Sequence, residues 1–317
     1  MIRVVAPSRL HFGLFHVPAG GAVEPGVRAF GGVGLMIDHP GVVVTLREAE
    51  ASRFEGTLAS RAQVFAMRFL LGLPEDRRRP FQVLVERCPP EHTGLGVGTQ
   101  LGLAVGKALA VACGQRGLSA PELAVRVGRG ERSAIGVHGF DRGGLLADAG
   151  KLPGEAVSAL LDQVVLPAEW RVVVFTPAVA RDWHGARERQ AFASAAGGDS
   201  EHLRRLVEER MLPAARAGQI DAFGEAVYEF NRKAGEPFAS SQGGVYASPE
   251  VESLVADVRA CGVRGVSQSS WGPTAFAVVP DGDTALSLLL RFRSRVPCFV
   301  TRVSAGHRLE GTGERPA

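Results

Sequence analysis

The chain has 317 residues, of which 45% are hydrophobic and 22% are charged, so it is long enough for two folded domains. Its formal net charge of +3 is too small to indicate a nucleic-acid partner. No apolar run approaches the roughly 20 residues that cross a membrane, so we expect a globular protein that binds neither nucleic acid nor membrane.

The first seven residues read as a strand that enters a turn, without the charged start and long apolar run of a signal peptide. The cysteines are scattered without CxxC spacing, which indicates buried reduced thiols rather than disulfides or a zinc site. They are Cys88, Cys113, Cys261 and Cys298. Together these features predict a cytoplasmic protein.

The first half of the chain alternates short β-rich runs with glycine turns before it becomes helical. We expect strands over 2–6, 34–37, 42–46 and 81–87, and helices over 59–71 and 99–113. A further helix begins at Ser119, because Ser119 and Glu122 have the spacing of a capping box.

The second half begins with strands over 145–149 and 170–175 and then becomes rich in helices. We expect helices over about 201–217, 219–234 and 249–261, strands over 265–268, 274–279 and 298–303, and a frayed polar tail from 309. The change in composition places a boundary near residue 155, which gives domains over 1–155 and 156–317. This mixed order favours an α+β fold over a regular βαβ array.

A glycine-rich loop stands directly before the helix at 99–113, with glycines at 94, 96 and 98. Such a loop lets the backbone approach an anion, and the helix start presents free N–H groups. A tight turn that needs glycine only for its backbone angles explains the pattern equally well. The loop is not a P-loop, because no lysine follows Gly98, and Thr99 replaces the third glycine of a dinucleotide fingerprint.

Basic residues are almost all arginine, since only Lys107, Lys151 and Lys233 among the 36 are lysines. A G+C-rich genome accounts for this bias, although arginine also suits bidentate recognition of phosphate and carboxylate. The cluster at 77–79 lies between two prolines and reads as a solvated loop.

The loop at 90–96, PEHTGLG, is similar to the start of the phosphate loop of the GHMP-kinase superfamily. Where that superfamily continues with two serines, this chain has VGTQ at 97–100, which resembles a non-kinase branch, the β-ribofuranosylaminobenzene 5'-phosphate synthases. Further segments resemble the same branch in the same order. They are PSRLHFGL at 7–14, RGERSAIG at 129–136, HGFDRGG at 138–144, QSSWGPT at 268–274 and, more weakly, RDWHG at 181–185 with Glu188.

The resemblance implies a two-domain GHMP-kinase-like fold, with an N-terminal ribosomal-protein-like βαβ domain and a C-terminal ferredoxin-like α/β sandwich. It implies condensation of phosphoribosyl pyrophosphate with 4-aminobenzoate or 4-hydroxybenzoate, with loss of CO₂ and pyrophosphate, in tetrahydromethanopterin biosynthesis. Mg²⁺ as cofactor and a homodimer follow from the same resemblance.

The resemblance also nominates site residues. The catalytic candidates are Arg9, His11, Arg132, His138, Asp141 and Trp271. The phosphate-binding candidates are Gly94, Leu95, Gly96, Val97, Gly98, Thr99, Gln100, Ser269 and Ser270. The substrate-binding candidates are Ser8, Arg142, Gly143, Gln268, Gly272 and Thr274. Asp141 either ligates Mg²⁺ or caps a turn.

Each nominated side chain also has a structural interpretation. Arg9 can pair with a surface carboxylate, and His11 and His138 can be hydrogen-bonded histidines of the core. Trp271 stands among small residues rather than in an apolar stripe, which favours a site.

Two other functions remain open. An ATP-dependent small-molecule kinase would use the same fold, but the loop lacks the two serines. A catalytically silent binding protein would keep the fold alone. The paired acids that hold ribose in common phosphoribosyltransferases are absent after the strand at 172–175, where Thr176 and Pro177 follow. If the chain uses that donor, it binds it differently.

Overall fold

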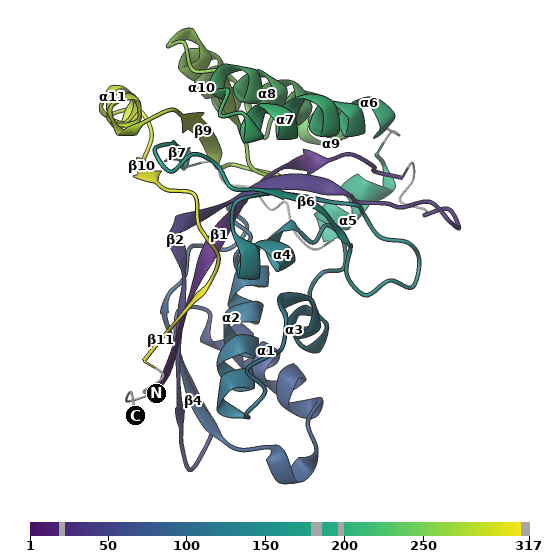
Figure 1. Cartoon of the computed structure of the whole chain (residues 1–317), viewed down its shortest axis with the longest axis vertical. Coiled ribbons are helices and arrows are strands. Elements are labelled where there is room, and N and C mark those ends of the chain that lie inside the picture. The colour runs from purple at the N-terminus through teal and green to yellow at the C-terminus, as the bar shows by residue number, and fades with distance from the viewer. Residues whose placement is uncertain (19–22, 179–185, 196–199, 312–317) are drawn as a thin grey trace.

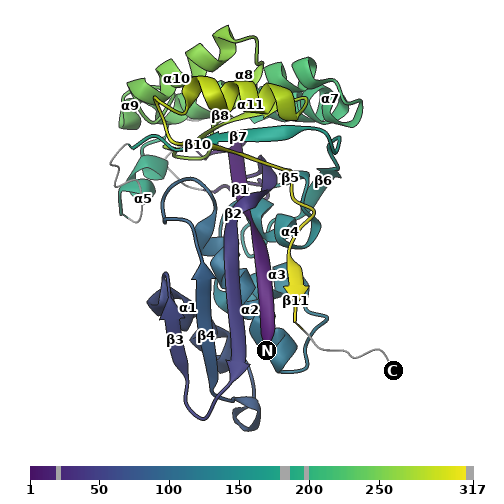
Figure 2. The same cartoon turned by 90° about the vertical axis from the view of Figure 1, so that its left-hand side faces the viewer.

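The computed structural model describes residues 1–18, 23–178, 186–195 and 200–311. A seven-stranded sheet forms its lower part in Figures 1 and 2, in the order β11-β1-β2-β4-β3, with β5 paired to β2 and β6 to β5. Its strands are β1 (Ile2–Leu14), β2 (Gly32–Glu48), β3 (Arg53–Gly56), β4 (Phe81–Arg87), β5 (Leu145–Asp148), β6 (Leu160–Val164) and β11 (Arg308–Glu310). β1 and β2 are antiparallel and long enough to reach the upper part of the molecule.

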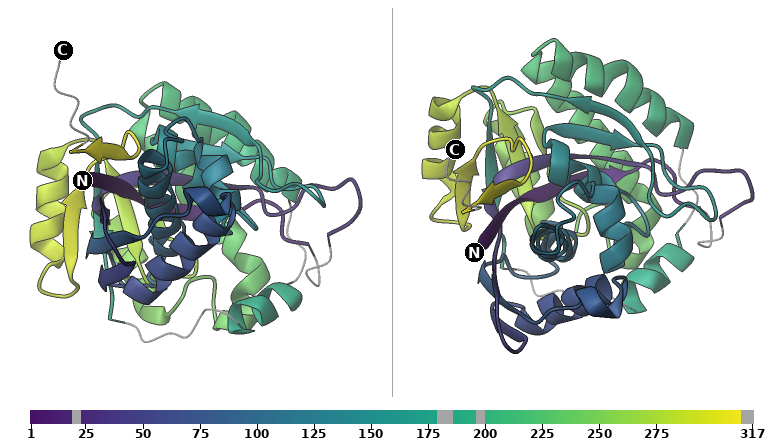
Figure 3. Two further views of the ribbon diagram at one scale, coloured as in Figure 1. Left: turned by 90° about the horizontal axis from the view of Figure 1, so that it is seen from below. Right: turned by 60° about the horizontal axis from the view of Figure 1, so that its bottom comes forward.

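Four helices cover one face of this sheet: α1 (Ala59–Leu71), α2 (Val97–Ala112), α3 (Ala120–Val127) and α4 (Ile135–Arg142). α2 contacts β1, β2 and each of the other three helices, so it lies in the middle of this layer (Figure 3). It is buried on all sides from Gln100 to Val111, as expected for a helix whose apolar residues do not form a single stripe. A 3₁₀ turn at Glu75–Arg77 joins α1 to β4.

A second, four-stranded antiparallel sheet has the order β10-β7-β9-β8. Its strands are β7 (Arg171–Phe175), β8 (Gly265–Gln268), β9 (Ala275–Val279) and β10 (Cys298–Thr301). Side chains alternate between its faces. Val172 and Val174 join a core with β1 and β2, whereas Val173 and Phe175 pack under α10 (Pro249–Ala260) and α11 (Gly282–Phe292).

The remaining helices lie between β7 and α10 in the chain, and most of them pack above the second sheet (Figure 1). They are α5 (Ala186–Ala193), α6 (Ser200–Arg205), a π-helical turn at Leu206–Met211, α7 (Leu212–Arg216), α8 (Ile220–Gly235), a 3₁₀ turn at Glu236–Phe238 and α9 (Ala239–Gln242). Among the residues described, no helix combines the length and the apolar character that a membrane span needs.

The α+β class is confirmed, and most predicted elements occur near their expected bounds. The strands expected at 34–37 and 42–46 are parts of one long strand, β2, and β1 extends to Leu14. The division at residue 155 stays a prediction. β6 and β11 follow that point in the chain but join the first sheet, and one hydrophobic core links both sheets.

The tail expected to fray from 309 begins in strand β11, whose Leu309 pairs with Val4 of β1. α4 and α11 had no predicted counterpart. The weakly matching segment 181–185 lies outside the described residues, as does the side chain of Glu188.

Candidate active site

A pocket of about 430 Å³ opens where four segments meet. These segments are β1, the glycine loop before α2, the loop between α3 and α4, and the loop after β8. The pocket is lined by Arg9, His11, Leu14, Arg61, Glu91, His92, Gly94, Leu95, Gly96, Val97, Gly98, Thr99, Arg129, Gly130, Glu131, Arg132, Ser133, Phe192, Ser270, Trp271 and Gly272. It brings together residues from both ends of the chain.

The glycine loop forms one wall and leads into α2. Gly96 is the N-cap of the helix in a left-handed conformation, with φ of 70°, and the N–H of Arg9 donates to the carbonyl of Leu95 at 3.0 Å. Gly98 stands in the first turn, where a Cβ would lie 2.8 Å from an Arg61 guanidinium nitrogen. Glycine at 98 therefore lets arginine approach a helix start, where N–H groups lack intrahelical partners.

Four arginines line the pocket against two glutamates, Glu91 and Glu131. The arginines come from β1, α1 and the α3–α4 loop: Arg9, Arg61, Arg129 and Arg132. Arg61 pairs with Glu91, and Arg129 donates to the hydroxyl of Thr99 at 3.3 Å. The excess of guanidinium groups beside a helix N-terminus suits a ligand with several negative charges.

Aromatic side chains form another part of the pocket wall. Trp271 packs edge-on against Phe192 and Phe238, with ring centroids 5.7 Å and 4.6 Å apart. The guanidinium of Arg132 lies 4.4 Å from the centroid of Phe192. A second cavity of about 70 Å³ adjoins this wall and shares Trp271, Phe192 and His11 with the main pocket. The wall thus offers a flat apolar surface with a cation beside it.

His11 is buried at the junction of the two cavities, with 6% of its surface exposed. Its Nε2 lies 3.0 Å from the hydroxyl of Ser133. Burial, followed by the positive charge of Arg9, holds the pKa of His11 well below its ordinary value of 6.5. The imidazole is therefore neutral at physiological pH.

The QSSWGPT segment contributes through its fold as much as through its side chains. The Ser269 hydroxyl accepts from the N–H of His11 at 3.0 Å and donates to the carbonyl of Gly94 at 2.7 Å. The Gln268 side chain accepts from the N–H of Ala247 and donates to the carbonyl of Ser270. These bonds hold Ser270, Trp271 and Gly272 at the pocket.

The nominated residues separate into three groups. The pocket is lined by Arg9, His11, Gly94, Leu95, Gly96, Val97, Gly98, Thr99, Arg132, Ser270, Trp271 and Gly272. Five other nominated residues are buried and lie outside that lining: Ser8, Gln100, Gln268, Ser269 and Thr274. His138, Asp141, Arg142 and Gly143 belong to α4 and its C-terminal end and do not line the pocket.

The third group has structural contacts of its own. His138 Nε2 bonds to the carbonyl of Ser158 at 2.7 Å. Asp141 accepts from the N–H of Ala120 at 2.7 Å and lies 3.3 Å from Nδ1 of His307. Although burial opposes it, the hydrogen bonds from these two partners keep the pKa of Asp141 below its usual range. Asp141 thus caps the start of α3, away from the pocket.

Sequence reasoning gave no role to Arg61, Arg129, Glu131, Ser133 or Phe192, which all line the pocket. Arg129, Glu131 and Ser133 stand inside the RGERSAIG motif, so the motif itself carried the signal. Arg61 lies on α1, outside every motif, and Phe192 lies on α5, beyond the weakly matching segment that ends at Glu188. Only the tertiary fold reveals those two.

Comparison with known proteins agrees with the fold. The family model of the GHMP kinases C terminal matches residues 211–298. A homoserine kinase from Cytophaga hutchinsonii superposes with a TM-score of 0.67 at 13% identity, covering 97% of this chain and 96% of that one. A 4-(cytidine 5'-diphospho)-2C-methyl-D-erythritol kinase gives 0.64 at 18% identity, covering 96% and 100%. At such identities these likenesses show the fold alone.

Closer relatives are found among curated sequences. The β-ribofuranosylphenol 5'-phosphate synthase of Methanothermobacter thermautotrophicus is 33% identical over 300 residues, which cover 87% of this chain and 88% of the relative. The protein of the same name from Archaeoglobus fulgidus is 29% identical over 310 residues, covering 92% of each. The predicted resemblance is confirmed.

Proposed function

Because the chain belongs to the family of the β-ribofuranosylphenol 5'-phosphate synthases, we propose that its pocket joins a ribose 5-phosphate unit to an aromatic acid. The donor is phosphoribosyl pyrophosphate, the acceptor is 4-hydroxybenzoate, and pyrophosphate and CO₂ leave. The observation that carries this proposal is the convergence of four arginines and an aromatic wall on one pocket.

The arginine side of the pocket suits the donor. Arg9, Arg61 and Arg129 stand around the start of α2, where backbone N–H groups and guanidinium forks both stabilise phosphate oxygens. Negative charge develops on the bridging oxygen as the anomeric C–O bond breaks. Fixed positive groups at that point stabilise the transition state more than they stabilise the bound donor.

The aromatic side suits the acceptor. Trp271 and Phe192 supply flat apolar surface, and Arg132 lies over Phe192, where its guanidinium can hold the carboxylate of the ring. The ring carbon that bears this carboxylate forms the new bond to the anomeric carbon. The ring–carboxylate bond then breaks, and its electron pair restores aromaticity as CO₂ departs. Positioning the two substrates in attack geometry contributes several kcal/mol.

We propose Mg²⁺ as the cofactor. This ion usually takes one or two carboxylates together with substrate phosphate oxygens. Glu91 and Glu131 are the carboxylates that line the described pocket, and Glu91 already pairs with Arg61. Glu131 is therefore the residue that would hold the ion, which would neutralise charge on the leaving pyrophosphate. Within the described residues no cluster of three metal-ligating side chains is present.

The kinase alternative has less support. The stretch after Gly96 carries one hydroxyl, that of Thr99, in place of two serines, and this hydroxyl accepts from Arg129.

The preference for 4-hydroxybenzoate over 4-aminobenzoate rests on the phenol in the name of the relatives. We propose a place in tetrahydromethanopterin biosynthesis from the resemblance to the same relatives.

We also propose that the enzyme is a cytoplasmic homodimer. Its four cysteines are free thiols, in keeping with a reducing compartment. The α1 residues Val64, Met67 and Leu71 are 49%, 53% and 64% exposed, at spacings that put them on one helix face. Light scattering after size exclusion tests the dimer, and a monomeric mass would contradict it.

The reaction is tested by release of labelled CO₂ from carboxyl-labelled 4-hydroxybenzoate and 4-aminobenzoate, with Mg²⁺ present and ATP absent. We expect release from 4-hydroxybenzoate that requires phosphoribosyl pyrophosphate. Donor-dependent release from 4-aminobenzoate alone would correct the acceptor. No release from either acid by folded protein would overturn the proposal.

A further inference from the structure

A chain of hydrogen bonds leads from His11 into the interior and ends at a buried carboxylate. His11 Nε2 lies 3.0 Å from Ser133 Oγ, and Ser133 Oγ donates to Asp148 Oδ2 at 2.7 Å. Asp148 is fully buried at the end of β5 and does not line the pocket. We refer to these three residues, His11, Ser133 and Asp148, as the relay.

The carboxylate of Asp148 receives four hydrogen bonds. Oδ2 accepts from Ser133 and from the N–H of Ala134 at 2.9 Å, and Oδ1 accepts from Ser158 Oγ at 2.7 Å and the N–H of Gly150 at 3.0 Å. Burial raises the pKa of Asp148, and these four bonds oppose that rise. Two of the donors are backbone amides, which can only donate, so each carboxyl oxygen of Asp148 accepts one N–H and one serine hydroxyl.

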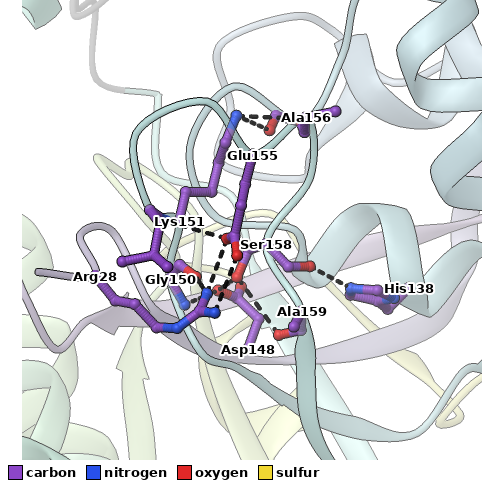
Figure 4. Close-up of polar contacts among 11 residues, drawn as sticks. Arg28, His138, Asp148, Gly150, Lys151, Glu155, Ala156, Ser158 and Ala159 are labelled. Atoms are coloured by element: carbon purple, nitrogen blue, oxygen red, sulfur yellow. Dashed lines mark hydrogen bonds and ion pairs between the residues drawn. The ribbon is translucent and has the colours of Figure 1, made fainter. Parts of the chain in front are cut away.

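The segment behind Asp148 is itself held in place (Figure 4). Arg28 pairs with Glu155 and donates to the carbonyl of Gly150, both at 2.8 Å. Lys151 donates to the carbonyl of Ala156 at 3.0 Å. These contacts hold the turn that carries Gly150 and Ser158. Both residues donate to Asp148 Oδ1, which leaves Oδ2 toward Ser133.

The relay decides which nitrogen of His11 carries the proton. A serine hydroxyl has one proton, and Ser133 gives it to Asp148. The N–H of Ile135 also donates to Ser133 Oγ, at 3.4 Å, so the remaining role of this oxygen toward His11 is that of acceptor. Nε2 must then be the protonated nitrogen, and in a neutral imidazole Nδ1 keeps its lone pair.

Nδ1 of His11 has no hydrogen-bond partner among the described residues. It is also not one of the fully buried polar atoms that lack a partner, so this nitrogen keeps some exposure. His11 lines both the main pocket and the adjoining cavity next to Trp271. The lone pair is thus left for a ligand at the point where the aromatic ring would meet the sugar.

We propose that Ser133 and Asp148 are positioning residues that hold His11 in the Nε2–H tautomer, so that Nδ1 acts as the base for the ring hydroxyl of the acceptor. This step rests on the proposed function. Nδ1 takes the hydroxyl proton, and the oxygen's electron pair feeds into the ring as the ring carbon bonds to the anomeric carbon and pyrophosphate leaves with its pair. Loss of CO₂ returns an electron pair to the ring, and the imidazolium gives its proton back to the phenolate.

Ser133→Ala and Ser158→Ala make a matched pair, because both hydroxyls donate to Asp148 at 2.7 Å and only Ser133 continues to His11. Long-range ¹H–¹⁵N spectra of substrate-free protein labelled in histidine, with His11 assigned through His11→Gln, report the tautomer directly. We expect the Nε2–H form in the wild type and in Ser158→Ala, and a mixture in Ser133→Ala.

Kinetic measurements on the same variants separate the positioning of His11 from a general loss of structure. Ser133→Ala should lower kcat by about tenfold to a hundredfold, less than the roughly 10²–10⁴-fold contribution of a general base itself because His11 is still present, with the KM for phosphoribosyl pyrophosphate unchanged. Ser133→Thr, which keeps the hydroxyl, should retain most of the wild-type kcat. An acceptor with a more acidic hydroxyl, 3-fluoro-4-hydroxybenzoate, should narrow the ratio of wild-type to Ser133→Ala rates.

The outcomes that overturn the proposal are distinct from failure of the proposed function. An Nδ1–H tautomer in the wild type, an unchanged tautomer in Ser133→Ala, or equal losses of kcat in the two serine variants would each refute the relay. If the wild type releases CO₂ from neither acid, the proposed function and the base step fall together. The spectra still decide whether Ser133 sets the tautomer of His11.

Discussion

The Ser269 hydroxyl donates to the carbonyl of Gly94 across 175 positions of sequence, at 2.7 Å. The same oxygen accepts from the N–H of His11. One buried side chain therefore joins the glycine loop, β1 and the loop after β8, which are three of the four segments that form the pocket.

Ser269→Ala should destabilise the protein, because it leaves the N–H of His11 and the carbonyl of Gly94 without this partner. Removing one member of such a buried pair costs about 1–3 kcal/mol. The matched control is Ser267→Ala on the same chain segment, since the Ser267 hydroxyl is buried and has no hydrogen-bond partner among the described residues. Denaturant unfolding should show a loss for Ser269→Ala alone, and equal effects would contradict the assigned role.

Gly98→Ala should weaken donor binding without weakening the fold. A Cβ at 98 would lie 2.8 Å from a guanidinium nitrogen of Arg61 and 3.6 Å, an ordinary contact distance, from one of Arg129, so the Arg61 guanidinium must move. Alanine in a helix is itself favoured over glycine by about 1 kcal/mol. We expect the KM for phosphoribosyl pyrophosphate to rise while Tm holds or increases.

Gly282→Ala is the control for that change, because a Cβ there meets no atom of the described part of the chain within 4 Å. Its KM should match the wild type. A fall in Tm for Gly98→Ala, or an unchanged KM, would show that the first turn of α2 does not position the arginines.

Arg129→Gln should raise the KM for the donor by about tenfold to a hundredfold, since a charge-assisted hydrogen bond contributes about 1.5–3 kcal/mol. Arg77→Gln removes the same charge from an exposed 3₁₀ turn outside the pocket and should leave KM unchanged. Steady-state kinetics at one ionic strength decide the comparison. Equal shifts would mean that only overall charge matters.

Asp141→Asn should affect stability in a pH-dependent manner. The pKa of Asp141 is lowered in the folded state, so its carboxylate stabilises the fold fully above the unfolded value of about 3.9. That contribution is lost as the pH falls through the folded pKa. The stability difference between wild type and variant should therefore be largest near neutral pH and shrink below about pH 4.

The same variant separates the two roles considered for Asp141. Because Asp141 binds Ala120 and His307 away from the pocket, we expect its dependence on Mg²⁺ to match the wild type at neutral pH. A large rise in the Mg²⁺ concentration needed for half-maximal activity would restore the carboxylate as a metal ligand.

Local sequence predicted the elements whose signals are local. The apolar run after the glycine loop is α2, and the capping box of Ser119 and Glu122 begins α3 as expected. α4 had no such prediction, because Gly136 and Gly139 stand in a helix of eight residues. A Cβ at 139 would collide with the Met36 side chain, so tertiary packing overrides the low helix propensity of glycine.

The site was predicted where a motif lies on the pocket wall, as for Arg9, Gly96 and Trp271. Motif membership did not separate residues that line the pocket from buried residues that hold the lining in place through hydrogen bonds. Ser269 and Gln268 belong to the second kind. Arg61 and Phe192 line the pocket although no motif includes either residue, and Asp148 acts through Ser133. Such contacts depend on which segments meet in space, and spacing along one chain does not encode that.

The central claim is that one pocket couples loss of pyrophosphate to loss of CO₂. The most direct test measures both products in the same reaction of phosphoribosyl pyrophosphate with carboxyl-labelled 4-hydroxybenzoate, with Mg²⁺ and without ATP. The account predicts pyrophosphate and CO₂ in equal amounts, and a product that contains both the ring and the sugar phosphate. Pyrophosphate without CO₂, or turnover that requires ATP and yields ADP, would contradict it.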